Sequence, residues 1–96
     1  MIVRYEPAAR DEVTETVRWY ADVAGPSVAE NFERQLDVTV QLLLRFPLLG
    51  VPGKRATRKL RLDSFPYTLH YRIDADVIRI LAVANQSRRP GYWQRQ

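Results

Sequence analysis

The chain has 96 residues, 46% of them apolar, which predicts one compact domain spanning residues 1–96. It contains no cysteine and a single histidine, His70, so disulfides and thiolate metal sites are excluded and other metal ligands are scarce. The sequence shows neither a signal-like N-terminus nor an apolar run long enough to cross a bilayer. We therefore expect a cytoplasmic protein with no metal, no other cofactor and no membrane partner.

Positive charge is concentrated in the second half of the chain. Residues 1–48 contain five Lys/Arg and eight Asp/Glu, a net charge of −3, whereas residues 49–96 contain ten and three, a net charge of +7. This asymmetry indicates either a nucleic acid ligand or an acidic protein partner. The simpler alternative is a solvated basic face of the kind found on many small domains.

The first half predicts a short strand followed by two helices. Ile2–Tyr5 alternates weakly and predicts a strand at or near a sheet edge. Apolar spacings of three and four predict a helix from Pro7 to Ala24, with Asp11 and Glu12 in its first turns.

A second helix is predicted to follow directly. Gly25 is placed to end the first helix in a left-handed conformation, and Pro26 to begin the next one. Its apolar spacing continues to Phe46, where Pro47 stops it, and the two helices should form an αα-hairpin. The Pro and Gly content of residues 48–53 predicts a loop.

The second half predicts three strands. In the first, Leu60 and Leu62 face the core and alternate with two cations, Lys59 and Arg61. In the second, alternation places four apolar or aromatic side chains on the core face: Tyr67, Leu69, Tyr71 and Ile73. The predicted fold is α+β, with an N-terminal strand, an αα-hairpin and a three-stranded antiparallel meander, the helices packing on one face of the sheet.

The third of these strands, Val77 to Ala84, is almost continuously apolar, which is typical of a central strand. We expect strict alternation along it. The residues predicted to pack on the helices are Ile78, Ile80, Ala82 and Ala84, and those predicted to face away are Arg79, Leu81 and Val83.

Basic side chains gather on the sheet face opposite the helices. Alternation places five there, Lys59, Arg61, His70, Arg72 and Arg79, with Arg88, Arg89 and Tyr92 following the last strand. Guanidinium groups bind phosphate oxygens through paired donors, and a tyrosine can transfer a proton or stack on a base. Lysine, arginine and tyrosine together can fill the roles that RNA cleavage needs without a metal.

Each of these residues also has a structural interpretation. Lys59 and Arg61 are what a solvated sheet face would carry, and His70 fits a surface or hydrogen-bonded role. Arg79 is as well explained by an ion pair, with Asp63, Asp74 or Asp76 as its partner. Three aromatic residues fit the border of a core or a partner groove: Trp19, Tyr20 and Trp93.

Three segments of the second half form a distinctive series: Phe65-Pro66-Tyr67, Ile80-Leu81-Ala82-Val83-Ala84 and Arg88-Arg89-Pro90-Gly91-Tyr92-Trp93. In this order they resemble a known family, the RelE/ParE toxins of type II toxin–antitoxin systems. The resemblance spans almost the whole chain. It implies a small toxin that a cognate antitoxin neutralises within a toxin–antitoxin hetero-oligomer, and we assign Trp19 and Tyr20 to the antitoxin contact.

Two activities divide this family. RelE-like members cleave mRNA on the ribosome, and the resemblance would assign that chemistry here to Lys59, Arg61, Arg72 and Tyr92. Two further arginines of the RelE pattern fall at Thr68 and Gln86, and Asn85 occupies a position where relatives carry histidine. Both arginines are therefore missing.

These departures favour the second activity, that of the ParE-like toxins, which inhibit DNA gyrase by binding. The predicted target contacts are then Arg79, Arg88, Arg89, Tyr92 and Trp93. A ribosome-dependent mRNA endonuclease is the alternative, and a non-toxic member that only binds partners is a second one.

Overall fold

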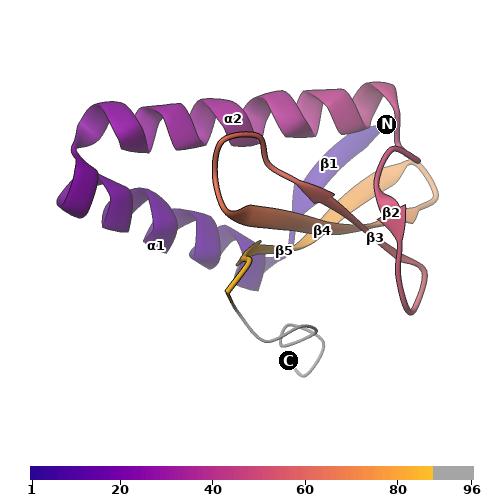
Figure 1. Cartoon of the computed structure of the whole chain (residues 1–96). Coiled ribbons are helices and arrows are strands. Elements are labelled where there is room, and N and C mark those ends of the chain that lie inside the picture. Colours follow the sequence, from indigo (N-terminus) through magenta and orange to yellow (C-terminus); the bar gives the residue numbers. More distant parts are fainter. Residues whose placement is uncertain (88–96) are drawn as a thin grey trace.

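The protein is described here by a computed structural model in which residues 1–87 are placed. Two helices form a hairpin that lies along one face of a sheet (Figure 1). Helix α1 comprises Pro7–Ala24 and α2 comprises Pro26–Arg45. This confirms both predicted helices, each of which begins at its proline, where the missing N–H costs no helical hydrogen bond.

The hairpin turn depends on Gly25. Its φ is +95° with ψ at 165°, a conformation that side-chain-bearing residues rarely adopt. The positive φ was predicted, although the extended ψ differs from a left-handed helical cap. This one residue reverses the chain, so α2 runs back along α1.

The sheet has five strands in the order β1-β5-β4-β3-β2. They are β1 (Ile2–Tyr5), β2 (Val51–Pro52), β3 (Thr57–Arg61), β4 (Tyr67–Asp74) and β5 (Val77–Asn85). The predicted antiparallel meander is β3-β4-β5, and β1 is an edge strand, as expected, that pairs with β5 in parallel.

The segment 48–53 is not only a loop, as had been predicted from its Pro and Gly content. Val51 and Pro52 pair with Lys59 and Arg58 to form β2 at the far edge of the sheet. Proline is tolerated there because an edge strand leaves half of its backbone groups without a neighbouring strand.

The core lies between the hairpin and the sheet. Four apolar residues at helical spacing on α2 are buried: Phe32, Leu36, Val40 and Leu43. From α1, Ala9 is fully buried and Tyr20 packs at the border. Thr16 of α1 is also buried. The residues that form the buried cluster are Ala9, Phe32, Leu36, Val40, Leu43, Leu62, Tyr67, Leu69, Tyr71, Ile78, Ile80 and Val83.

A β-bulge interrupts β5. Tyr71 on β4 pairs with Ile80, but the preceding residue, His70, pairs with Ala82, so Leu81 has no partner on β4. One additional residue on a strand shifts every later side chain to the opposite face.

The bulge overturns the prediction for the end of β5. Val83 lies opposite Leu69 and belongs to the core, whereas Ala82 and Ala84 pair with residues on the face away from the helices. Strict alternation had assigned these three the other way. The prediction was wrong because a run of small and branched apolar residues fits either face and gives no sign of a bulge.

Glu12 forms a contact that the local sequence pattern did not predict. Asp11 and Glu12 lie just beyond the first turn of α1, which contains no acidic residue. β1 pairs with β5 only as far as Ile80. Beyond that point a Glu12 carboxylate oxygen accepts a hydrogen bond of 3.0 Å from the Val83 amide, which fastens α1 to the open edge of β5.

No helix within residues 1–87 is long and apolar enough to cross a membrane.

Candidate functional site

Three rows of paired residues form a basic face on the side of the sheet away from the helices. Residues that pair across neighbouring strands share a face. The rows are Arg61-Thr68-Ala84, Lys59-His70-Ala82 and Thr57-Arg72-Arg79-Arg4. The structure thus brings all five predicted basic residues to one face and adds Arg4, which sequence analysis missed because its strand was not known to pair with β5.

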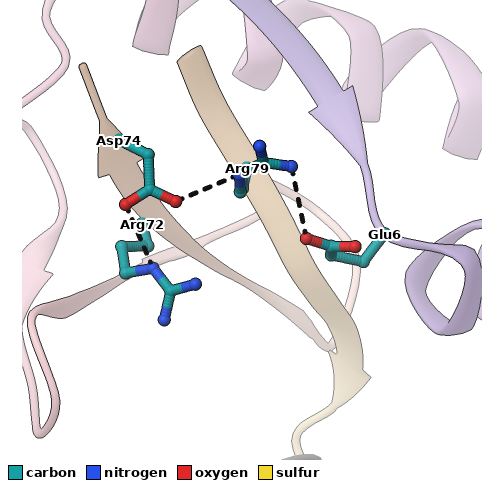
Figure 2. A network of polar contacts seen from close by, with 4 residues as sticks. All are labelled: Glu6, Arg72, Asp74 and Arg79. Atoms are coloured by element: carbon teal, nitrogen blue, oxygen red, sulfur yellow. Dashed lines mark hydrogen bonds and ion pairs between the residues drawn. The ribbon is translucent and has the colours of Figure 1, made fainter. Parts of the chain in front are cut away.

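Arg72 and Arg79 face each other directly across β4 and β5, and a shared carboxylate offsets their repulsion (Figure 2). Arg79 Nε lies 3.0 Å from Asp74 Oδ2, and Arg72 Nε lies 3.4 Å from Asp74 Oδ1. Arg79 Nη1 also lies 3.6 Å from Glu6 Oε1, at the start of α1. Asp74 is one of the three partners predicted for Arg79; Glu6 was not among them.

The ion pairs hold three elements together. Glu6 follows β1, Arg79 belongs to β5, and Asp74 ends β4. Their side chains are 37–43% exposed, so solvent screens each pair and each contributes little free energy alone. The two carboxylates hold the guanidinium of Arg79 in place and partly neutralise its charge.

Arg61 and Lys59 have different surroundings. Arg61 Nη2 donates a hydrogen bond of 2.9 Å to Gln86 Oε1, in the turn after β5. Gln86, the position at which the RelE pattern would place an arginine, thus contacts an arginine from β3. Both Arg61 and Lys59 are exposed, and neither forms an ion pair among residues 1–87.

His70 lies beside Lys59 in the middle row. Burial, and to a smaller extent the Lys59 ammonium, lowers the pKa of His70 below its ordinary value of 6.5. The imidazole is therefore neutral near pH 7, and the positive charge of this face comes from the lysine and the arginines.

The predicted tail residues Arg88, Arg89, Tyr92 and Trp93 lie outside the described residues. Their assignment as target contacts, and that of Tyr92 as a catalytic group, stay predictions.

Trp19 and Tyr20, the predicted antitoxin contacts, have unequal exposure. Trp19 is 55% exposed. Tyr20 packs edge-on against Trp19 and Phe65, with ring centroids 5.0 and 5.3 Å apart, and burial raises its pKa. Trp19 can thus meet a partner directly, whereas Tyr20 supports it from the border of the core.

A pocket of about 260 Å³ lies beside Trp19, between α1 and the end of β5. Its lining includes Glu12, Thr16, Trp19, Tyr67, Val83 and Asn85. The bulge in β5 creates part of this wall, because it turns Val83 toward α1. Among residues 1–87, no three His, Asp or Glu side chains gather as metal ligands would.

Known proteins resemble this chain in sequence and in fold. The family described as "ParE toxin of type II toxin-antitoxin system, parDE" matches residues 3–90. The chain belongs to this family. It is a toxin of the RelE/ParE superfamily of type II toxin–antitoxin systems.

A curated protein of Sinorhizobium fredii, described as "Putative toxin Y4kP", is 34% identical to this ParE-family toxin over 59 residues. The match covers 60% of the chain and 62% of that protein, so it spans less than two thirds of the relative's length.

Two solved structures share the fold. A structure of the chromosomal ParDE toxin–antitoxin system of P. aeruginosa matches with a TM-score of 0.78 and 19% identity, covering 88% of this chain and 95% of the other. The isolated RelE toxin of E. coli matches with a TM-score of 0.63 and 20% identity, covering 98% and 93%. Both predictions, of the superfamily and of the α+β fold, are confirmed.

Proposed function

We propose that this ParE-family toxin inhibits DNA gyrase by binding it, and that a cognate antitoxin neutralises the toxin in the cytoplasm. The observation that supports this most directly is the ParE family match over residues 3–90. The structural similarity to a ParDE system, in which a toxin and an antitoxin occur together, supports the antitoxin partner.

The geometry of the basic face favours binding over RNA cleavage. Phosphoryl transfer requires cations that converge on one phosphate. Arg61 and Arg72 belong to rows that are four residues apart along β4, a separation of about 14 Å at about 3.4 Å per residue. Arg72 is also held by Asp74, on the side away from Arg61.

Thr68 reinforces this interpretation. It pairs with Arg61 on one side and Ala84 on the other. A RelE-like endonuclease would have a second guanidinium at the position of Thr68, where this chain has only a hydroxyl. A face with dispersed cations suits an acidic protein surface, because many separate contacts can share the binding free energy.

Lys59 and Arg61 are therefore proposed as target contacts within the described part of the chain, because both are exposed and unpaired by carboxylates there. Arg79 has a smaller proposed share, since its guanidinium already binds Asp74 and Glu6. The tail residues Arg88, Arg89, Tyr92 and Trp93 complete the proposed surface.

Two purified reactions run side by side test the proposal. The toxin is added to gyrase with relaxed plasmid and ATP, and to ribosomes programmed with a defined mRNA. We expect loss of supercoiling and accumulation of gyrase–DNA cleavage complexes, with the mRNA intact. Codon-positioned mRNA cuts with normal supercoiling would overturn the proposal in favour of the endonuclease.

Charge reversals locate the contact. Lys59→Glu with Arg61→Glu should weaken gyrase inhibition by about tenfold or more, whereas Arg18→Glu, on exposed α1, should leave inhibition unchanged. Arg88→Glu with Arg89→Glu should remove growth arrest in induced cells while the circular dichroism spectrum is retained. Growth that continues normally with folded wild-type toxin would instead indicate a non-toxic, partner-binding member.

A further inference from the structure

An apolar surface remains exposed where α2 ends. Five side chains form it, and we call them the α2 patch: Val38, Leu42, Phe46, Leu48 and Leu49, which are 55%, 41%, 54%, 67% and 45% exposed. Val38 and Leu42 are four residues apart on one stripe of α2, and Phe46, the C-cap residue whose amide donates to the Leu42 carbonyl, continues this spacing. Exposed apolar groups that gather in this way mark interaction sites more often than chance.

Hydrogen bonds fix the loop that carries Leu48 and Leu49. The buried Tyr71 hydroxyl donates to the Pro47 carbonyl at 2.7 Å and accepts from the Gly50 amide at 2.9 Å. Arg58 Nη1 donates to the Leu48 and Gly50 carbonyls at 3.2 and 2.9 Å. Four bonds thus hold the backbone while its leucines point outward, so a partner would meet a surface that is already ordered.

The border of the α2 patch is cationic. Arg34 lies one turn before Val38 on the same stripe, and Arg45 lies beside Phe46, its Cζ 6.0 Å from the ring centroid. Neither arginine forms an ion pair within residues 1–87. Asp37 is the acidic residue nearest to Val38 in sequence. Burial, and to a smaller extent the Asp37 carboxylate, raises the pKa of Tyr5 on β1.

We propose that the α2 patch docks an acidic amphipathic helix of the antitoxin, which sets its apolar side on Leu42 and Phe46 and its carboxylates against Arg34 and Arg45. The proposal rests on the proposed function in that it takes the antitoxin as the source of the helix. Val38 to Phe46 covers about 12 Å at 1.5 Å per residue, which fits a partner helix of two to three turns.

A second copy of the chain is a poorer occupant. A symmetric contact would bring the same unpaired arginines of both copies together around the apolar centre, and like charges at an interface border oppose association. An acidic helix would be attracted by the same groups. The α2 patch is also separate from Trp19, which lies near the hairpin turn at the opposite end of α2 from Phe46.

The test uses the full-length toxin and its cognate antitoxin, identified as the adjacent gene product that prevents growth arrest on co-expression, with affinity measured by calorimetry. Leu42→Glu and Leu48→Glu should each weaken binding by about tenfold or more. Ala21→Glu, which introduces the same charge at an exposed apolar position of α1, is the matched control and should bind within about twofold of wild type. Thermal unfolding of each variant verifies the fold.

Two further measurements separate the proposal from a general surface effect. Arg34→Glu with Arg45→Glu should slow association and reduce its dependence on salt. Hydrogen exchange of the complex should show protection across residues 42–50 that free toxin lacks.

The outcomes distinguish the two proposals. If wild-type toxin binds the antitoxin but Leu42→Glu and Leu48→Glu bind equally well, or residues 42–50 gain no protection, the docking site is wrong and the antitoxin partner stands. If the free toxin dimerises and Leu42→Glu abolishes the dimer, the α2 patch belongs to a second copy and the docking proposal is also overturned. If wild-type toxin does not bind the antitoxin at all, both proposals fall.

Discussion

The Gly50 amide donates a hydrogen bond of 2.9 Å to the hydroxyl of Tyr71. Tyr71 lies 21 positions later in the chain and is fully buried. The same hydroxyl donates to the Pro47 carbonyl. Tyr71→Phe should therefore destabilise the fold by about 1–2 kcal/mol, because it removes the partner of both backbone groups while keeping the ring. Urea unfolding measures the loss, and an unchanged midpoint would contradict it.

A substitution at Gly50 tests how closely its backbone packs against Tyr71. A Cβ added there would lie 2.7 Å from the Tyr71 ring and hydroxyl and 3.0 Å from the Lys59 carbonyl. Gly50→Ala should thus cost about 1–3 kcal/mol through overpacking. Gly53→Ala is the control, because its nearest neighbour is a threonine hydroxyl at 3.2 Å and the position is exposed. Equal losses at both glycines would argue against a role for the tyrosine contact.

The contact between Glu12 and Val83 yields a second prediction. Glu12→Ala should destabilise the protein by about 1 kcal/mol and speed hydrogen exchange at the Val83 amide, which would lose its acceptor. Glu12→Gln retains an acceptor oxygen and should recover part of the protection. Glu15→Ala, one turn along the same helix and exposed, controls for the charge change. Slow exchange at Val83 in Glu12→Ala would be inconsistent with the bond.

The arginine pair gives a third prediction. Asp74→Asn removes the charge that bridges Arg72 and Arg79, and we expect a loss of at most about 1 kcal/mol because all three side chains are more than a third exposed. The loss should be greater at low salt, where repulsion between the guanidinium groups is least screened. Asp76→Asn, in the adjoining turn, serves as the comparison. Equal salt dependence of stability in both variants would count against the bridge.

His70 gives a fourth prediction, on pH. Because its pKa is lowered in the folded state, the unfolded chain binds a proton more readily, so stability is highest above the ordinary pKa of 6.5. Stability should fall as the pH drops from 6.5 to the lowered value, below which this contribution no longer changes. His70→Gln should lose less stability than wild type over this interval.

The neighbour of His70 supplies the control. Lys59→Gln removes the positive charge that disfavours the imidazolium, and should raise the pKa of His70 in an NMR titration. Burial is the larger cause, so the pKa should stay below 6.5 in that variant. A pKa unmoved by Lys59→Gln would show that the ammonium does not act on the ring.

The helices and the meander could be predicted from local signals. Proline at the first helical position, Gly25 and helical spacing define α1 and α2, and alternation defines β4. These signals are short-range, since each depends on residues within a few positions. The gathering of basic side chains on one sheet face followed from the same alternation and was correct for all five residues.

What only the tertiary structure decided involves residues distant in the chain. The parallel pairing of β1 with β5, the hydrogen bond from Val83 to Glu12 and the Tyr71 contacts join segments 21 to 75 positions apart, and no local pattern encodes such partners. The bulge at Leu81 belongs with them. The side chains of residues 81–84 could face either side of the sheet, so the packing around β5 sets their orientation. Val83 pairs with Leu69, faces α1 and belongs to the core. The sequence alone therefore determined the family and the basic face, whereas packing decided which cations remain exposed and unpaired in the described chain.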